Sequence, residues 1–147
     1  MRFTRTRDKI LFIDTSAFVA IANEGDIWHS DSAKFLDDIK SGKTTFRTLV
    51  TSDYIIDETI TRIRFSVGHK EAVKWGDKIL SSAVIDVISV DKEIFDKAWD
   101  LFKRYEDKEL SFTDCTSFVI MERMNIRHAF AFDEDFERLG FKQLPGE

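Results

Sequence analysis

Four acidic residues of this 147-residue chain stand where folding could bring their carboxylates together: Asp14, Glu58, Asp114 and Asp133. Each follows a short apolar run or lies near the start of a predicted helix, so it can point toward one edge of a sheet. Crowded carboxylates repel one another unless a cation joins them. Oxygen ligands without histidine or cysteine favour Mg²⁺ or Mn²⁺ over zinc or iron. The acids therefore predict a centre for one or two divalent ions.

Glu58 and Asp114 each also have an ordinary structural explanation. Glu58 lies roughly 200° around its predicted helix from Ile56. It can therefore face a cleft, bulk water or Arg62 one turn further on. Asp114 is the fourth residue of Ser111-x-x-Asp114, the spacing of a capping box at a helix N-terminus. For each residue taken alone, both explanations stay open.

The remaining acids have similar alternatives. Asp14 and Asp133 could be ordinary turn or cap residues. Asp135 lies two residues after Asp133, and it could be a fifth ligand or an acid that stabilises the first turn of a helix. Taken jointly these explanations are strained, because the acids recur where predicted strands end.

Short apolar runs alternate with stretches of helical spacing along the chain. We predict strands at 9–13, 44–50, 83–90, 129–132 and 141–144, and helices at 17–22, 27–39, 53–67, 71–80, 91–105, from 111 onward and at 134–139. Thr15 and Ser16 are expected to cap the first helix. Strands separated by helices imply an α/β fold with a mostly parallel sheet and helices on both faces. Ligands of such folds bind beyond the carboxyl ends of the strands, where Asp14 and Asp133 fall.

Length and composition favour one domain that spans residues 1–147. A hydrophobic content of 43% is enough for one buried core, and a single Pro and six Gly leave little material for linkers. A net charge of -5 argues against the broadly cationic surface of many sequence-independent nucleic-acid binders. A local basic rim is still compatible with this charge, and Arg62 and Arg64 are candidates for RNA contacts.

The cellular location follows from what the sequence lacks. Cys115 is the single cysteine, so no intramolecular disulfide can form. Residues 1–8 form a basic stretch that we expect to be flexible, and the apolar run after it is too short for a signal peptide or a membrane span. We therefore expect a cytoplasmic protein that does not associate with a membrane.

The acidic segments, in their order along the chain, resemble the motifs of PIN-domain nucleases. Within that family they are most similar to the toxin ribonucleases of VapBC-type toxin–antitoxin pairs. The motifs are Ile13-Asp14-Thr15-Ser16-Ala17-Phe18, Thr51-Ser52-Asp53-Tyr54-Ile55-Ile56-Asp57-Glu58-Thr59, Leu110-Ser111-Phe112-Thr113-Asp114-Cys115 and Phe132-Asp133-Glu134-Asp135-Phe136. The resemblance covers about residues 9–144.

This resemblance implies a fold, a site and an activity. The fold would be a three-layer α/β sandwich. The acidic ligands would be Asp14, Glu58, Asp114 and Asp133, with Asp135 at a position that varies more. Ser16 and Thr113 would support them, with Ser16 orienting Asp14 or a bound water. The activity would be Mg²⁺- or Mn²⁺-dependent hydrolysis of RNA to 5′-phosphate and 3′-hydroxyl ends. A homodimer and a small antitoxin that covers the cleft are the implied protein partners.

Three other interpretations of the sequence compete with the PIN-domain nuclease. An Asp after the first strand can be the nucleophile of a phosphoryl-transfer enzyme, but such enzymes need an Asp two residues later, where this chain has Ser16, or a Lys after a later strand. A PIN-like module could bind or process RNA outside a toxin–antitoxin system, although the intact acidic set argues against a member that only binds. A dinucleotide-binding fold lacks its glycine cradle after the first strand.

Overall fold

The computed structural model describes residues 9–146, and the expected flexible stretch 1–8 lies outside the described residues. Strands and helices alternate through most of this range. The strands are β1 (Ile10–Ile13), β2 (Thr48–Ser52), β3 (Ile85–Ile88), β4 (His128–Phe130) and β5 (Lys142–Leu144). The helices are α1 (Thr15–Ala22), α2 (His29–Lys40), α3 (Asp53–Ser66), α4 (His69–Leu80), α5 (Lys92–Arg104), α6 (Phe112–Met124) and α7 (Asp135–Arg138).

The five strands form one sheet in the order β3-β2-β1-β4-β5, and every pairing in it is parallel. β1 lies in the middle, where Leu11 and Phe12 are completely buried, because helices cover both faces of the strand. β1 pairs with β2 on one side and with β4 on the other. The carboxyl ends of the three central strands therefore meet at one edge.

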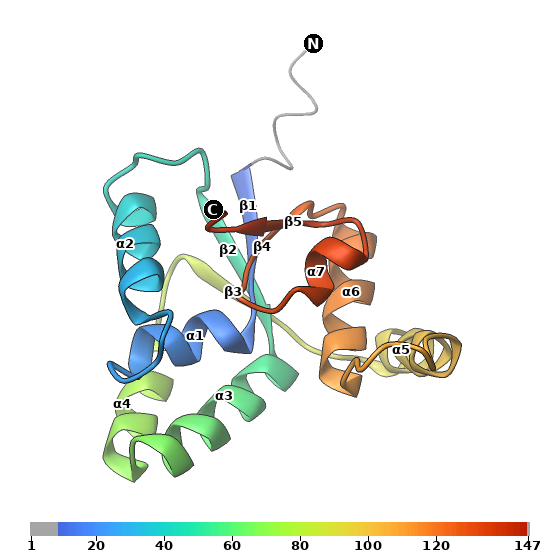
Figure 1. Ribbon diagram of the computed structural model, residues 1–147, viewed down its shortest axis with the longest axis horizontal. Coiled ribbons are helices and arrows are strands. Elements are labelled where there is room, and N and C mark those ends of the chain that lie inside the picture. The colour runs from blue at the N-terminus through green and yellow to red at the C-terminus, as the bar shows by residue number, and fades with distance from the viewer. Residues whose placement is uncertain (1–8, 147) are drawn as a thin grey trace.

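Helices cover both faces of the sheet (Figure 1). Helices α1 to α4 lie to one side of the strands, and α5, α6 and α7 lie to the other. The predicted α/β sandwich with a parallel sheet is confirmed. Within residues 9–146, no helix is long and apolar enough to cross a membrane.

Several predicted boundaries were wrong, for local reasons. β2 begins at Thr48 and not at residue 44, because the Phe46 amide donates to Thr44 Oγ1 in a turn, at 3.3 Å. β3 is shorter than predicted because it is an edge strand that pairs only with β2. The residue that caps α1 is Asp14, and Thr15 and Ser16 already belong to the first turn.

Candidate metal centre

Asp14 directly follows β1 and caps α1 at the carboxyl edge of the sheet. The backbone amide and hydroxyl of Ser16 both donate to Asp14 Oδ2, at 3.1 and 2.7 Å. Ser16 Oγ in turn accepts from the amide of Phe132, at 3.0 Å. This hydroxyl therefore links Asp14 to the segment that carries Asp133.

Asp114 lies in the first turn of α6. Its amide donates to Ser111 Oγ at 3.0 Å, and Asp114 Oδ2 accepts from the Ser111 amide at 3.1 Å. The predicted capping box is confirmed. The hydrogen bond from the Ser111 amide uses only one lone pair of the Asp114 carboxylate. The capping role therefore does not exclude a second role as a ligand.

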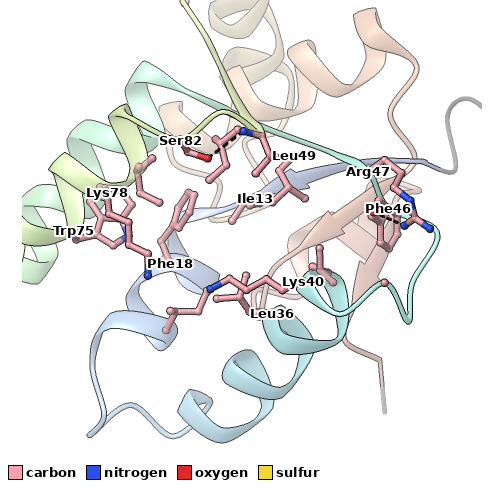
Figure 2. A pocket seen from close by; sticks show the side chains of 16 residues that line it. Ile13, Phe18, Leu36, Lys40, Phe46, Arg47, Leu49, Trp75, Lys78 and Ser82 are labelled. Atoms are coloured by element: carbon pink, nitrogen blue, oxygen red, sulfur yellow. Dashed lines mark hydrogen bonds between the residues drawn. The ribbon is translucent and has the colours of Figure 1, made fainter.

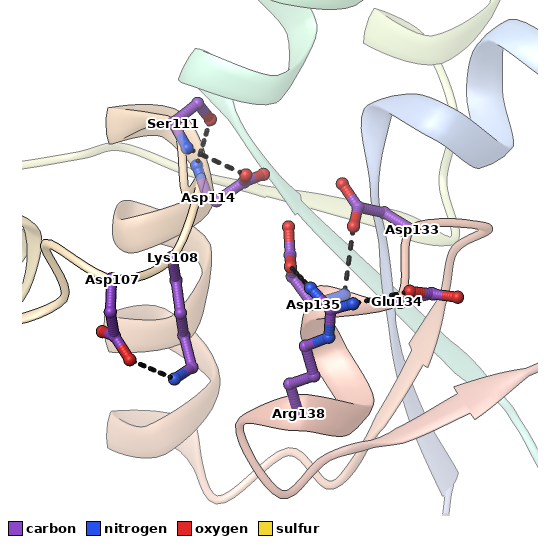
Figure 3. A network of polar contacts seen from close by, with 8 residues as sticks. All are labelled: Asp107, Lys108, Ser111, Asp114, Asp133, Glu134, Asp135 and Arg138. Carbon is purple, nitrogen blue, oxygen red and sulfur yellow. Dashed lines mark hydrogen bonds and ion pairs between the residues drawn. The ribbon is translucent and has the colours of Figure 1, made fainter.

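Asp133 and Asp135 bring two further carboxylates to Asp114. An oxygen from each of the three lies within 4.8 Å of the others, and Figure 3 shows the three groups pointing into one shared space between α6 and the start of α7. Asp133 Oδ1 accepts from the Asp135 amide at 3.0 Å. Asp135 therefore joins the cluster as well as starting a helix.

Arg138 closes the cluster on the α7 side (Figure 3). It donates to Asp135 Oδ1 at 3.3 Å and to Glu134 Oε2 at 2.7 Å. Burial raises the pKa of Asp135, and the neighbouring Asp133 raises it further, while Arg138 opposes the shift. One cation of the chain thus already compensates part of the negative charge at this end of the site.

Glu58 reaches the site from α3. Its Oε1 accepts a hydrogen bond of 2.6 Å from Thr15 Oγ1 on α1. Glu58 makes no ion pair with Arg62 among the ion pairs found within residues 9–146. From the sequence, Thr15 was expected only as a cap. No local signal reveals its contact with Glu58, because the two residues are 43 positions apart.

Burial and crowding oppose ionisation of two of the acids. Burial raises the pKa of Asp14 to about 6, and the charges of Glu58 and Asp133 add to this effect. Burial likewise raises the pKa of Asp114 to about 7, and the charge of Asp14 contributes. These mutual effects place Asp14, Glu58, Asp114 and Asp133 in one electrostatic neighbourhood. A bound cation would relieve the repulsion within it.

The donor set fits a hard divalent ion. The carboxylates supply oxygen ligands of the kind that Mg²⁺ and Mn²⁺ bind. Cys115, although next to Asp114, is completely buried in the core. Burial raises the pKa of its thiol to about 11, with Asp114 adding to the shift, so a thiolate ligand is disfavoured.

The supporting residues named from the sequence have different surroundings. The carbonyl of Thr113 accepts from Thr116 Oγ1 at 2.6 Å and from Ser117 Oγ at 3.2 Å inside α6. Arg62 and Arg64 are exposed on α3, and Arg64 Nη1 lies 2.7 Å from His69 Nδ1 at the start of α4.

Comparison with known proteins identifies the family. Residues 11–142 match the PIN domain. The 23S rRNA-specific endonuclease VapC20 of Mycobacterium tuberculosis is 35% identical over 138 residues, which cover 94% of this chain and all of that protein. A VapC ribonuclease of Archaeoglobus fulgidus is 30% identical over 125 residues, 84% of this chain and 77% of that protein. The chain therefore belongs to the PIN-domain family and groups there with VapC proteins.

Solved structures agree with this grouping. The crystal structure of Mycobacterium tuberculosis VapC20, described as a Sarcin-Ricin loop cleaving toxin, superposes with a TM-score of 0.81 at 32% identity, over 89% of this chain and 95% of that one. VapBC2 from Rickettsia felis, bound to a DNA fragment from its promoter, superposes with a TM-score of 0.66 at 14% identity, over 91% and 96%. The second likeness concerns the fold alone.

Proposed function

We propose that this protein is a metal-dependent endoribonuclease and the toxin of a type II toxin–antitoxin pair. The observation that carries the proposal is the convergence of carboxylates from separate segments at the carboxyl edge of the sheet. In a PIN-domain chain with VapC ribonucleases among its relatives, such a centre is suited to hydrolysing an RNA phosphodiester bond. The whole chain, residues 1–147, is one domain in this proposal, and it works in the cytoplasm.

The acids divide into principal and auxiliary ligands. Asp14, Asp114 and Asp133 would hold one Mg²⁺ or Mn²⁺ ion, and Glu58 would hold a bound water or a second ion. Asp135 completes the Asp114–Asp133 side, where the three carboxylates are close enough to share an ion. The raised pKa values of Asp14 and Asp114 support this role, because carboxylates that repel one another gain most from a shared cation.

When bound, the ion would supply positive charge near the scissile phosphate and make a water more acidic. The chain supplies the geometry. Ser16 orients the carboxylate of Asp14, and Ser111 holds that of Asp114 through the capping box. Thr113, adjacent to Asp114, keeps the first turn of α6 in place through its carbonyl. Cleavage by water in line with the leaving 3′-oxygen gives 5′-phosphate and 3′-hydroxyl ends.

Arg62 is the better of the two candidate RNA contacts. It lies one helical turn after Glu58 and on the same face of α3, whereas Arg64 is turned toward His69. A guanidinium there could bind a backbone phosphate next to the cleaved bond. Because the Mycobacterium tuberculosis relative is named for 23S rRNA, a 23S rRNA stem-loop is the first substrate that we propose.

An antitoxin helix is the occupant that we propose for an apolar pocket of about 580 Å³ beside α1. Side chains from α1, α2, α4 and the sheet surround it (Figure 2). Its apolar walls include Phe18, Leu36 and Trp75, while the charged residues that line it are Lys40, Arg47 and Lys78. An amphipathic helix with acidic residues beside its apolar stripe would match both features.

The outer face of α5 is the homodimer contact in this proposal. Phe95, Trp99 and Phe102 recur at helical spacing and are 42%, 49% and 40% exposed. At roughly 150–250 Å² per aromatic side chain, they expose roughly 200–330 Å², a sizeable part of the 800 Å² or so that each partner of a stable pair buries. Phe112 packs against them from α6.

A second copy fits the α5 face better than RNA does. The lysines beside the aromatic rings already pair within the helix, Lys92 with Asp96 at 2.9 Å and Lys103 with Asp100 at 3.6 Å. Few uncompensated cations are left there for phosphates. A flat aromatic stripe with charges of both signs on its rim is self-complementary about a two-fold axis.

The proposed activity is tested by RNA cleavage with the purified protein, Asp14→Asn, Asp114→Asn and the control Asp77→Asn, an exposed acid of α4. With Mn²⁺ or Mg²⁺ we expect the wild type and the control to cleave a 23S rRNA stem-loop. We expect the cleavage rate of both site variants to fall at least about 100-fold. This is more than the loss of a residue that only orients a ligand usually causes. Cleavage in EDTA, or an active Asp114→Asn protein, would overturn the proposal.

A further inference from the structure

Thr15 lies where α1 meets α3. It is the first residue of α1, only 2% exposed, and its hydroxyl donates to Glu58 Oε1 at 2.6 Å. This distance is at the short end for a hydroxyl donor and is typical of a bond to a charged acceptor. The contact joins residues 43 positions apart, so it depends on how the two helices pack.

Glu58 differs from the other acids in how it is held. The carboxylates of Asp14, Asp114 and Asp133 each accept a hydrogen bond from a residue two or three positions away. The longer Glu58 side chain has three rotatable bonds, is only partly buried and stands in the middle of α3. Fixing such a side chain in one rotamer costs conformational entropy, which a preformed hydrogen bond offsets.

We propose that Thr15 is a positioning residue for Glu58. Its hydroxyl occupies Oε1, leaves Oε2 as the oxygen for an ion or a water, and holds the carboxylate in the electrostatic neighbourhood of Asp14. Thr15 itself is not a ligand. This inference rests on the proposed function, in which Glu58 serves the metal centre.

Thr15 and Ser16, in the same turn of α1, donate hydrogen bonds to different acids. Ser16 turns its hydroxyl to Asp14 and to the Phe132 amide, whereas Thr15 turns its hydroxyl to α3. The first turn of α1 thereby sets the spacing between the acids of β1, α3 and the segment after β4. Loss of a group that orients a ligand typically costs 10- to 100-fold in metal affinity or activity.

The test compares Thr15→Val, Thr15→Ser, Glu58→Gln and the double variant Thr15→Val/Glu58→Gln. Valine keeps the branched shape and removes the hydroxyl, while serine restores it. The first measurement is Mn²⁺ binding to the RNA-free protein by calorimetry, and the second is kcat and KM for RNA cleavage. Thermal unfolding checks that each variant folds, and Thr15→Ala replaces Thr15→Val if the valine protein does not fold.

We expect Thr15→Val to weaken Mn²⁺ binding or lower kcat by about 10- to 100-fold, with KM for RNA little changed. Thr15→Ser should stay within about threefold of the wild type, since its hydroxyl can still donate. In the Glu58→Gln background the valine change should have no further effect, because Thr15 acts through Glu58.

Two results would overturn the inference. The first is wild-type Mn²⁺ binding and kcat in Thr15→Val, and the second is an equal loss of Mn²⁺ binding or kcat on Thr15→Val in the wild-type and the Glu58→Gln backgrounds. The second result would assign Thr15 a role in packing alone. Failure of the wild-type protein to bind Mn²⁺ or to cleave RNA would instead overturn the proposed function, so the two failures are distinguishable.

Discussion

Short hydrogen bonds from neighbouring hydroxyls and amides hold the individual acids of the site. Ser16 binds Asp14, and Ser111 binds Asp114, yet the pKa of each acid lies well above its ordinary value. Burial therefore outweighs these hydrogen bonds. In a folded protein without metal, the two carboxyl groups hold their protons more tightly than in the unfolded chain, so folding stability and metal affinity both depend on pH.

The first prediction at this scale concerns the stability of the metal-free protein. Because the folded-state pKa values of Asp14 and Asp114 are raised, to about 6 and about 7, protonation favours the folded state. Their stabilising contribution is full below the ordinary pKa and is lost as the pH rises through those two values. In EDTA the melting temperature should fall by several degrees between pH 5.5 and 8, since each group contributes on the order of 1–3 kcal/mol.

The Asp114→Asn variant distinguishes the titration of Asp114 from that of other groups. The amide cannot ionise, so at pH 8 the metal-free variant should melt above the wild type, and the pH dependence between 6 and 8 should be shallower. Asp77→Asn serves as the control, with a wild-type slope. Saturating Mn²⁺ should reduce the wild-type slope by favouring the ionised carboxylates. A melting temperature that rises toward pH 8 in EDTA would contradict this account of the site.

At the scale of single elements, α5 has two apolar faces where a surface helix needs one. Ile94 and Ala98 face the core and are nearly completely buried. Phe95, Trp99 and Phe102 lie on the next face around the helix and are far more exposed than the inner pair. Phe112 of α6 covers part of this second face, and a second copy would cover the rest.

Trp99→Glu tests the α5 contact. A charge in the middle of the aromatic stripe would have to be desolvated in a dimer, so we expect this variant to elute as a monomer and the wild type as a dimer in size-exclusion chromatography with light scattering. The variant should keep its fold, since Trp99 is 49% exposed. Phe65→Glu is the matched control, because Phe65 is 82% exposed on α3. A wild-type monomer at micromolar concentration, or a dimeric Trp99→Glu protein, would contradict the prediction.

At the scale of the whole molecule, the acidic centre lies at the carboxyl edge of the sheet, whereas the apolar pocket extends to Phe46 and Arg47, just before the start of β2. Ile13 and Phe18 line the pocket, while Asp14, between them in sequence, faces the acids. A partner that fills the pocket and also covers the acids would therefore have to extend along α1, whose residues Phe18 and Ile21 line the pocket.

Leu36→Lys tests the pocket as an antitoxin site. Leu36 lines the pocket from α2 and is partly exposed, so a lysine there should weaken an apolar contact without unfolding the chain. Co-expressed with a candidate antitoxin that the wild type binds, the variant should lose co-purification or bind at least about tenfold more weakly, about 1.4 kcal/mol. Val73→Lys, on the exposed side of α4, should bind normally. Equal binding by the wild type and Leu36→Lys would place the partner elsewhere.

Local patterns predicted much of this molecule. The apolar run at 9–13 is the central strand, and the spacing of Ser111 and Asp114 is a true capping box. The alternation from Thr44 to Val50 predicted a strand that begins too early, because Phe46 is buried although it lies before β2. For Asp135 the sequence left open a ligand or a first-turn acid, and its position in the structure fits both. Thr15 was expected only as a cap, and its neighbours in sequence do not reveal its contact with Glu58.

The sequence by itself determined where helices and strands form and which residues can bind a hard cation. These properties depend on side-chain type and on neighbours within a few positions, which a periodic pattern records. Only the tertiary structure decided that Thr15 meets Glu58 and that Asp135 joins Asp114 and Asp133. Such contacts arise when crossover connections bring β1, β2 and β4 side by side, and the packing of the whole chain sets which side chains then face one another.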